Sequence, residues 1–245
     1  AWDVASITTE SPGTGSSKQP LFVACTDNTN PCTTAKRQAI TSSPAVSFHP
    51  SDLNSLMIYF GTGKYLESSD ATTTQVQSMY GVMEKITVDS GTGALTFETT
   101  TRGKLKQAII TDISTCSAGG QTYACSARTV SAPSPAIDWS TDKGWYENLP
   151  TSGERIIAPV QLNNGIVFYN TFIPSTSPCD YGGTGYLMGV QSDTGGQITD
   201  FALFDTDKNK AFNSYDMSTG GIKIGAVLGG STVIKPSSGK GVGIA

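Results

Sequence analysis

Histidine is nearly absent from this sequence, since His49 is the only one among 245 residues. A Ser-His-Asp catalytic set would have to use that side chain as its base, and the Gly-x-Ser-x-Gly turn of many hydrolases does not occur. Because His49 stands between an apolar run and Pro50, we expect it to end a strand and to make a structural hydrogen bond. We therefore predict that the protein is not an enzyme.

Charge of either sign is also scarce. Charged residues make up 15% of the chain, and 16 Lys and Arg against 20 Asp and Glu give a formal net charge of −4. A chain without a basic surface does not gather phosphates and release their counterions, so nucleic acid is not an expected partner.

Long apolar runs are missing too. None approaches the roughly 20 residues that cross a bilayer as a helix. The first residues also lack the charged and then apolar head of a signal peptide, so we expect Ala1 to be a processed or trimmed end. The sequence predicts no membrane span.

What the sequence does contain is short runs of β-branched and aromatic residues, separated by turns rich in Gly, Ser, Thr and Asn. Such runs are typical of strands, and the class predicted is all-β. Residues 69–79 fit a short helix, and residues 104–113 fit either a helix or a strand. The expected strands are 21–24, 45–48, 56–60, 81–88, 94–99, 156–161, 165–170, 186–190 and 198–204.

Some of these strands recur in similar units. Residues 42–46 followed by 57–63 resemble residues 157–161 followed by 166–171, and 225–234 is a degenerate third copy. The first two units each continue into a further strand and a Gly-rich turn, Ser-Gly-Thr-Gly or Asp-Thr-Gly-Gly, where glycine supplies the positive φ of a tight hairpin.

Repeated hairpin units favour a partial β-propeller with quinoprotein-like blades of antiparallel strands and long loops, in one domain over 1–245. A β-sandwich or an irregular β-domain is the alternative. An incomplete ring exposes strand edges, so we expect a partner or the rest of a longer chain to complete it. The expected blades are 20–100, 104–150, 153–204 and 217–245.

Five cysteines are present. Cys25 and Cys32 are seven residues apart and Cys116 and Cys125 nine apart, each pair in a polar loop, which favours two loop-closing disulfides. Zinc is the alternative, but one histidine and no Cys-x-x-Cys disfavour it. Disulfides imply export to the periplasm or the exterior. Cys179 is either free or paired with a part of a longer chain.

The loop 205–216 has the spacing of a twelve-residue calcium loop. Oxygen-bearing side chains stand at positions 1, 3, 5, 9 and 12, and position 7 would lend its carbonyl. Two lysines, one at the position that is normally glycine, predict weak affinity, on the order of 10⁻⁴–10⁻³ M. A solvated loop that binds no ion is the alternative. The predicted ligands of Ca²⁺ are Asp205, Asp207, Asn209, Ala211, Asn213 and Asp216.

Several other patterns have simpler explanations. Gly-Thr-Gly-Lys at 61–64 lacks the earlier glycine of a phosphate loop and has Tyr65 where Ser or Thr would reach magnesium, so we expect a β-turn. Trp139 and Trp145 flank a turn and are expected to pack as a cross-strand pair.

Acidic side chains could in principle form catalytic carboxylate pairs, but spacing in the sequence does not place them together, and we expect surface acids. Glu154 and Arg155 fit a surface ion pair. The candidate carboxylate pairs are Asp138 with Glu147 and Glu84 with Glu154.

Six phrases of the chain, in order, resemble the C-terminal region of the PilY family of type IV pilus-tip adhesins and biogenesis factors. That resemblance implies a modified β-propeller, adhesion or pilus biogenesis, and a place outside the cell at the pilus tip, after export through the periplasm. It implies pilin or minor pilins as partners, with a host surface or glycan as a further possibility. The phrases are 20–24, 58–67, 144–150, 153–155, 179–183 and 205–216.

We therefore expect a non-enzymatic pilus-associated module that acts through surface contacts and is modulated by calcium. One alternative is a carbohydrate- or matrix-binding lectin-like domain that uses Trp139 and Trp145. Another is a quinoprotein-like propeller dehydrogenase, which would need several cationic and carboxylate groups around a cofactor on the propeller axis.

Overall fold

The computed structural model describes residues 6–8, 20–85, 87–93, 95–96, 99–175, 182–225, 233–234 and 243–244. Strands dominate these residues, beside three short 3₁₀ helices, η1 (Thr34–Lys36), η2 (Ser68–Thr72) and η3 (Arg102–Lys104). The predicted all-β class is confirmed. None of the helices described has the length and the apolar character that crossing a membrane requires.

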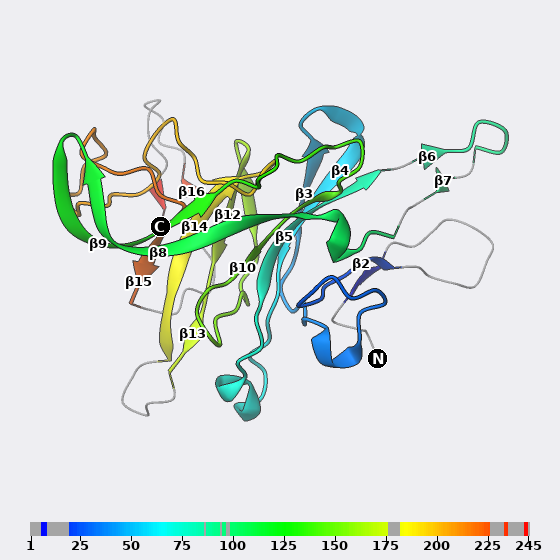
Figure 1. Cartoon of the computed structure of the whole chain (residues 1–245), viewed down its shortest axis with the longest axis horizontal. Coiled ribbons are helices and arrows are strands. Elements are labelled where there is room, and N and C mark those ends of the chain that lie inside the picture. Colours follow the sequence, from blue (N-terminus) through cyan, green and yellow to red (C-terminus); the bar gives the residue numbers. More distant parts are fainter. Residues whose placement is uncertain are drawn as a thin grey trace.

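A single large sheet carries most of the strands (Figure 1). Its eleven strands are β3 (Ala45–His49), β4 (Asp52–Gly61), β5 (Ser78–Lys85), β8 (Lys106–Ala118), β9 (Gln121–Ser131), β10 (Gly144–Asn148), β11 (Gln161–Asn163), β12 (Ile166–Asn170), β13 (Ile173–Pro174), β14 (Gly183–Gln191) and β15 (Gly221–Ile224). Three two-stranded ribbons pair β1 (Ser6–Thr8) with β2 (Pro20–Val23), β6 (Thr87–Val88) with β7 (Leu95–Thr96), and β16 (Val233–Ile234) with β17 (Gly243–Ile244).

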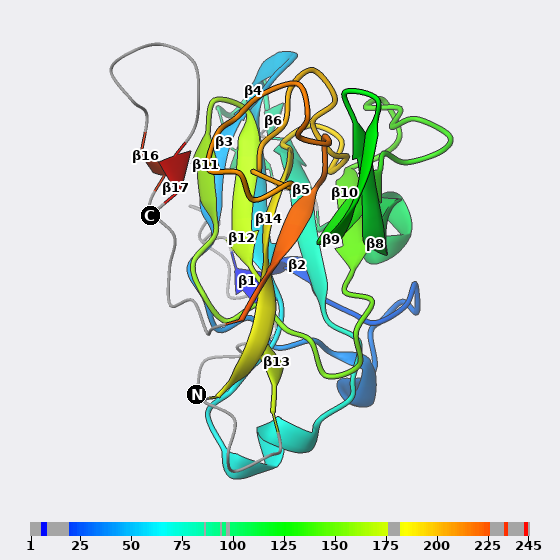
Figure 2. The ribbon, with the colours of Figure 1, turned by 90° about the vertical axis from the view of Figure 1, so that its left-hand side faces the viewer.

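The large sheet is strongly curved. Its order is β11-β12-β14-β15-β9-β8-β10-β5-β4-β3, with β13 paired to β14. The pairing of β8 with β10 is parallel, whereas the other neighbours in this sheet are antiparallel. The two edge strands, β3 and β11, come to lie beside each other, as Figure 2 shows. The sheet therefore closes around an interior.

The main core fills that interior. Successive side chains of a strand point to opposite faces, so Met57 and Tyr59 of β4 point inward and Ile58 and Phe60 point outward. Trp145 of β10 is fully buried in this core. Strands from both halves of the sheet contribute to the main cluster, whose members include Met57, Tyr59, Met79, Trp145, Val167, Tyr169 and Met188.

A second cluster lies on the outer face of β4 and β5, where β2 covers it. The ring of Phe22 lies 5.9 Å from that of Phe60 and 5.1 Å from that of Tyr80. These side chains are almost completely buried, so the segment that begins at β2 is held to the sheet by the same hydrophobic effect that fills the interior.

The longest hairpin, β8–β9, projects from the sheet at the left of Figure 1. Its two-residue turn consists of Gly119 and Gly120, with φ of 57° and 76°, as this type of hairpin turn requires. The ambiguous segment 104–113 thus belongs mainly to a strand. The strand pattern of β9 was not recognised in the sequence.

Two of the expected strands are wrong in whole or in part. Residues 198–204 form no strand, although Ile198, Leu203 and Phe204 are buried. Of 156–161, Gln161 alone is in a strand. In both segments the apolar side chains reach the core from irregular backbone, a condition that an apolar run does not distinguish from a strand. The short helix expected over 69–79 is right only in part, because η2 ends at Thr72 and β5 begins at Ser78.

The division of the chain into four blades stays a prediction. Cys179 lies outside the described residues, as does most of the third repeat copy, 225–234.

Candidate functional site

The loop 205–216 follows the buried residues Leu203 and Phe204 and leads toward β15. It brings together three of the six predicted calcium ligands. One carboxylate oxygen from each of Asp205, Asp207 and Asp216 lies within 4.8 Å of the other two. Such a cluster of hard oxygen donors could hold a metal ion, and hard oxygen ligands are those that Ca²⁺ prefers.

Backbone N–H groups of the loop shape this cluster. The Asp205 carboxylate accepts hydrogen bonds from the N–H of Asn209 at 3.1 Å and of Lys210 at 2.7 Å. The Asp216 carboxylate, which is 7% exposed, accepts from the N–H of Thr206 at 2.8 Å and of Asn213 at 3.0 Å. The first and the last acid therefore fix the two ends of one compact turn.

The other predicted ligands are engaged differently. The Asn209 side chain donates from Nδ2 to Asp207 at 2.7 Å, while its Oδ1 accepts from the Ala211 N–H at 2.8 Å. The Asn213 Oδ1 accepts from the Tyr215 N–H at 2.8 Å. In this conformation the two amide oxygens stabilise turns of the loop, and Ala211 is exposed.

Lys210 stands where a calcium loop normally has glycine, yet it adopts the backbone conformation that glycine would supply. Its φ is 67°, and that of Lys208 is 60°. A residue with a Cβ is strained in this region by about 1–2 kcal/mol. The loop thus retains the sharp turn despite the substitution.

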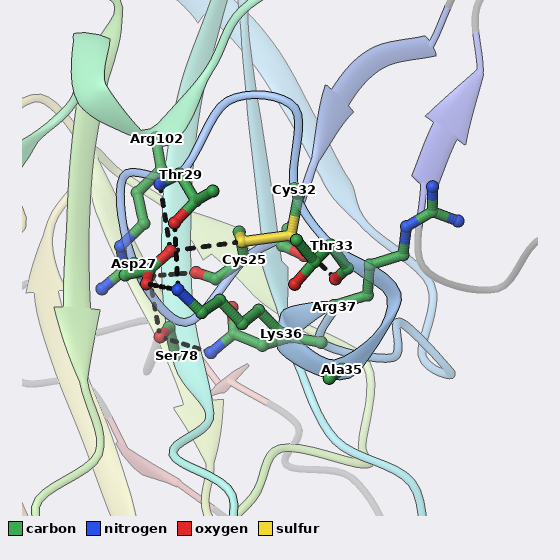
Figure 3. Close-up of a disulfide and its surroundings, with 12 residues drawn as sticks. Cys25, Asp27, Thr29, Cys32, Thr33, Ala35, Lys36, Arg37, Ser78 and Arg102 are labelled. Carbon is green, nitrogen blue, oxygen red and sulfur yellow. Dashed lines mark hydrogen bonds and ion pairs between the residues drawn. A yellow bond between two sulfur atoms is a disulfide. The ribbon is translucent and has the colours of Figure 1, made fainter.

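Both predicted cysteine pairs are disulfides, Cys25–Cys32 and Cys116–Cys125. Figure 3 shows the first, in the loop between β2 and η1. Lys36 of η1 contacts Asp27 of this loop with its Nζ at 2.5 Å, and this hydrogen bond holds the pKa of Asp27 well below its usual range.

Arg102 anchors the same loop to the sheet. Its side chain is buried and donates to the carbonyl of Cys25 at 2.8 Å, to Asn148 Oδ1 at 2.6 Å and to the hydroxyl of Tyr80. The guanidinium also lies 3.8 Å from the centre of the Tyr146 ring. Sequence reasoning did not single out this arginine, because its partners are spread over the chain.

Arg128 of β9 forms a buried ion pair that corrects one prediction. Its Nη1 lies 2.5 Å from Glu154 Oε1, its Nε lies 2.7 Å from Asp112, and its guanidinium stacks 3.5 Å from the centre of the Tyr186 ring. The expected surface pair of Glu154 with Arg155 is therefore wrong. Glu154 is fully buried and its charge partner is 26 residues away.

Arg155 instead binds backbone carbonyls of the segment that contains Gly-Thr-Gly-Lys. Its guanidinium donates to the carbonyls of Lys64 at 2.8 Å, Asp70 at 2.7 Å and Thr73 at 3.2 Å. Gly63 has a φ of 138°, and a Cβ there would lie 2.5 Å from the Arg155 side chain. The motif thus has a structural role, but the expected β-turn is wrong, because Gly61 ends β4 and Gly63 forms an isolated parallel bridge with Ile40.

The remaining candidates also have structural environments. His49 ends β3, is 2% exposed, and accepts from the Ser51 N–H at Nδ1 over 3.2 Å, and burial lowers its pKa. Its ring packs edge-on against Trp139 at 4.3 Å. Trp139 lies in a turn and Trp145 in β10, so the expected cross-strand pair of tryptophans is wrong, although Trp145 does pack in the core.

The acids of the two candidate carboxylate pairs are separated by their local roles. Asp138 accepts from the Ser140 N–H at 3.0 Å in an exposed turn, whereas Glu147 is fully buried beside Tyr169. Glu84 is 5% exposed on β5, and burial raises its pKa. The expectation that all four are surface acids is wrong for Glu84, Glu147 and Glu154.

One strongly curved sheet of eleven strands, whose edge strands β3 and β11 lie beside each other, defines an all-β domain. Residues 6–118 match the family model described as the PilY1 beta-propeller domain. The chain belongs to the PilY1 family, in the C-terminal region of that protein.

Two curated relatives support this family assignment. The chain is 31% identical over 190 residues to the "Type IV pilus biogenesis factor PilY1" of Pseudomonas aeruginosa strain PAK, a match that covers 72% of this chain and 16% of that protein. A "Type IV pilus biogenesis factor PilY1 homolog" of Xylella fastidiosa is 31% identical over 229 residues, which are 91% of this chain and 15% of that protein. The chain thus spans about one sixth of the curated relatives it matches.

A solved structure agrees in fold. The crystal structure of the Pseudomonas aeruginosa PilY1 C-terminal domain superimposes with a TM-score of 0.64 at 22% sequence identity. The match covers 93% of this chain and 46% of that one.

Proposed function

We propose that this chain is the C-terminal propeller region of a type IV pilus biogenesis factor and tip adhesin, and that it acts through surface contacts without catalysis. The observation that carries the proposal is the 31% identity over 190 residues to a protein named "Type IV pilus biogenesis factor PilY1". The buried cations Arg102, Arg128 and Arg155 support a scaffold role, because each binds groups of the chain itself.

The partners that we propose are pilin or minor pilins, and the rest of a longer chain that completes the propeller. A host surface or a glycan is the ligand proposed for adhesion. Two disulfides are expected in an oxidising compartment, which supports export through the periplasm to the cell surface and the pilus tip. In this view the predicted segments 20–100, 104–150, 153–204 and 217–245 are blades of that propeller.

Calcium is the proposed modulator, bound by the loop 205–216. Asp205, Asp207 and Asp216 would supply the charged ligands, and the clustering of their oxygens supports this assignment. Asn209, Asn213 and the carbonyl of Ala211 would complete the shell after the amide oxygens leave their present hydrogen bonds. Affinity on the order of 10⁻⁴–10⁻³ M is expected, as in extracellular modules.

The test is genetic and biochemical. In a bacterium that encodes this chain, deletion of the coding region for 20–225 should reduce surface pili, and the intact gene should restore them. The protein should also be found in the sheared pilus fraction and, by immunogold labelling, at filament tips. Unchanged piliation together with absence from the pilus fraction would refute the proposal. A visible absorption band of a bound quinone cofactor in the purified protein would contradict the non-catalytic part.

A further inference from the structure

A surface pocket of about 650 Å³ lies beside the loop 205–216. One wall is the irregular segment 199–203 and the other is 212–218. The hydroxyl of Ser218 donates to the carbonyl of Phe201 at 3.2 Å and so joins the two walls. This volume is within the range of about 300–1,000 Å³ that is usual for sites that bind small molecules.

Two half-exposed aromatic side chains form the main apolar part of the pocket. Phe201 is 50% exposed and Phe212 is 54% exposed, and one ring comes from each wall. Ala202 and Leu203 also line the pocket. Aromatic rings left half in water on both walls offer an apolar ligand two faces to cover.

The charged part has a single sign. Among the described residues that line the pocket, the charged ones are Asp200 and Asp216, and none is a lysine or an arginine. The carboxylate of Asp216 is already bound by the N–H groups of Thr206 and Asn213. Asp200 is exposed, and its one neighbour among the hydrogen bonds described is the hydroxyl of Thr199, at 3.5 Å. The Asp200 carboxylate is thus available to a ligand.

We propose that this pocket binds a peptide segment of a partner protein that presents a lysine or arginine beside an apolar residue. Charge complementarity selects the cation, which would pair with Asp200 and lie over the rings of Phe201 and Phe212. The apolar neighbour covers Ala202, beside the buried Leu203 that also lines the pocket. The site differs from the acidic triad of the calcium proposal, although Asp216 contributes to both.

The experiment uses three blocked tripeptides that differ in the central residue, acetyl-Leu-Lys-Leu-amide and its Gln and Glu counterparts. Each is titrated into the 245-residue chain in EDTA, and the methyl NMR signals of Ala202 and Leu203 are followed. Because calcium is removed and pili are not involved, the result is independent of both parts of the proposed function. The Lys peptide should shift these two signals and bind at least 10-fold more tightly than the Gln peptide, and the Glu peptide should bind most weakly.

Variants separate the contribution of the Asp200 charge from that of the Phe201 ring. Asp200→Asn should bring the affinities for the Lys and Gln peptides to within about twofold of each other, and Phe201→Ala should weaken binding of both. Phe48→Ala, at an exposed aromatic residue on β3 outside this pocket, is the matched control and should change nothing. Unchanged melting temperatures establish that the variants are folded.

Three outcomes of the peptide titrations would overturn the proposal. They are equal affinity for the Lys and Gln peptides, shifts confined to methyl groups outside the pocket, and no shift with any of the peptides at 10 mM. Perturbation of the same signals by methyl mannoside in place of the peptides would likewise assign the pocket to sugars and refute peptide recognition.

Discussion

The Tyr169 hydroxyl donates a hydrogen bond to Glu147 Oε2 in the middle of the main core, where both side chains are fully buried. The other carboxylate oxygen of Glu147 has no hydrogen-bond partner among the described residues. Burial raises the pKa of Glu147 to about 8. The nearby cation Arg128 is already paired with Glu154 and Asp112, so within the described part of the chain the core acid has no counterion of its own.

Stability should therefore fall as the pH rises from about 4.5 to about 8. Between these values the unfolded chain has lost the Glu147 proton and the folded chain still holds it, so deprotonation favours unfolding. The difference between a pKa of 4.5 and one of about 8 corresponds to about 5 kcal/mol, an upper limit for the loss. Below pH 4.5 the contribution of the protonated Glu147 carboxyl to the stability is fully present.

Glu147→Gln tests this prediction, because the amide keeps the shape and removes the ionisation. The variant should be more stable than the wild type at pH 8.5 in urea titrations and show little difference at pH 4.5. Glu67→Gln, at an exposed glutamate of the η2 cap, is the control for the amide substitution and should retain the fall in stability between pH 4.5 and pH 8.5. An identical pH dependence in Glu147→Gln and the wild type would show that this carboxyl does not titrate as described.

A second prediction concerns the buried ion pair of Arg128 and Glu154. Arg128→Met should lower the free energy of unfolding by about 3–5 kcal/mol, because Glu154 would be left charged in the interior without a partner. The double variant with Glu154→Gln should recover part of that loss. Lys36→Met, which breaks the surface pair with Asp27, is the control and should have a small effect. Strict additivity of the two buried substitutions would contradict the coupling.

This ion pair also shows where the sequence stops being informative. Cysteine spacing predicted both disulfides, and the short β-rich runs predicted the fold class, because each signal is local. Arg128 and Glu154 meet through the arrangement of the sheet, and the neighbour Arg155 was the reasonable local guess for the partner of Glu154. The false strand at 198–204 has a similar cause, since apolar residues record burial and not backbone pairing.

The acidic loop could be predicted only in part, because the spacing of its residues is a local signal and the clustering of their oxygens depends on the fold. The spacing of Asp205, Asp207 and Asp216 is visible in the sequence, and the fold brings their oxygens together. The pocket beside it could not be predicted, because its two walls, 199–203 and 212–218, become neighbours through the fold of the chain, where Ser218 donates to the carbonyl of Phe201.

A third prediction follows from the contacts of Arg155. The ammonium group of Arg155→Lys cannot donate to three carbonyls as the planar guanidinium does, so the segment 63–73 should open more often. The amides of Leu66 and Glu67, which donate to Asp70, should exchange with deuterium about 10-fold faster or more. The exchange rates of amides in the β8–β9 hairpin should be unchanged. Equal protection of Leu66 and Glu67 in both proteins would exclude this role.

The fourth prediction separates strain from charge at Lys210. Its φ of 67° suits glycine, so Lys210→Gly should raise stability in EDTA by up to about 1 kcal/mol. Lys210→Gln keeps the backbone strain and should not raise the stability in EDTA. Both variants remove a positive charge next to the acidic triad, so both should increase the rise in melting temperature that calcium causes.

Thermal melts with and without 10 mM calcium measure both effects. With a dissociation constant of about 1 mM, the wild type should gain about 1.4 kcal/mol, or roughly 3–5 °C. Asp205→Ala removes a ligand and should abolish the gain, whereas Asp193→Ala, at an acid outside the triad, should retain it. A calcium effect that survives in Asp205→Ala would place the ion elsewhere, because this carboxylate holds both the first position of the loop and the N–H groups that close its turn.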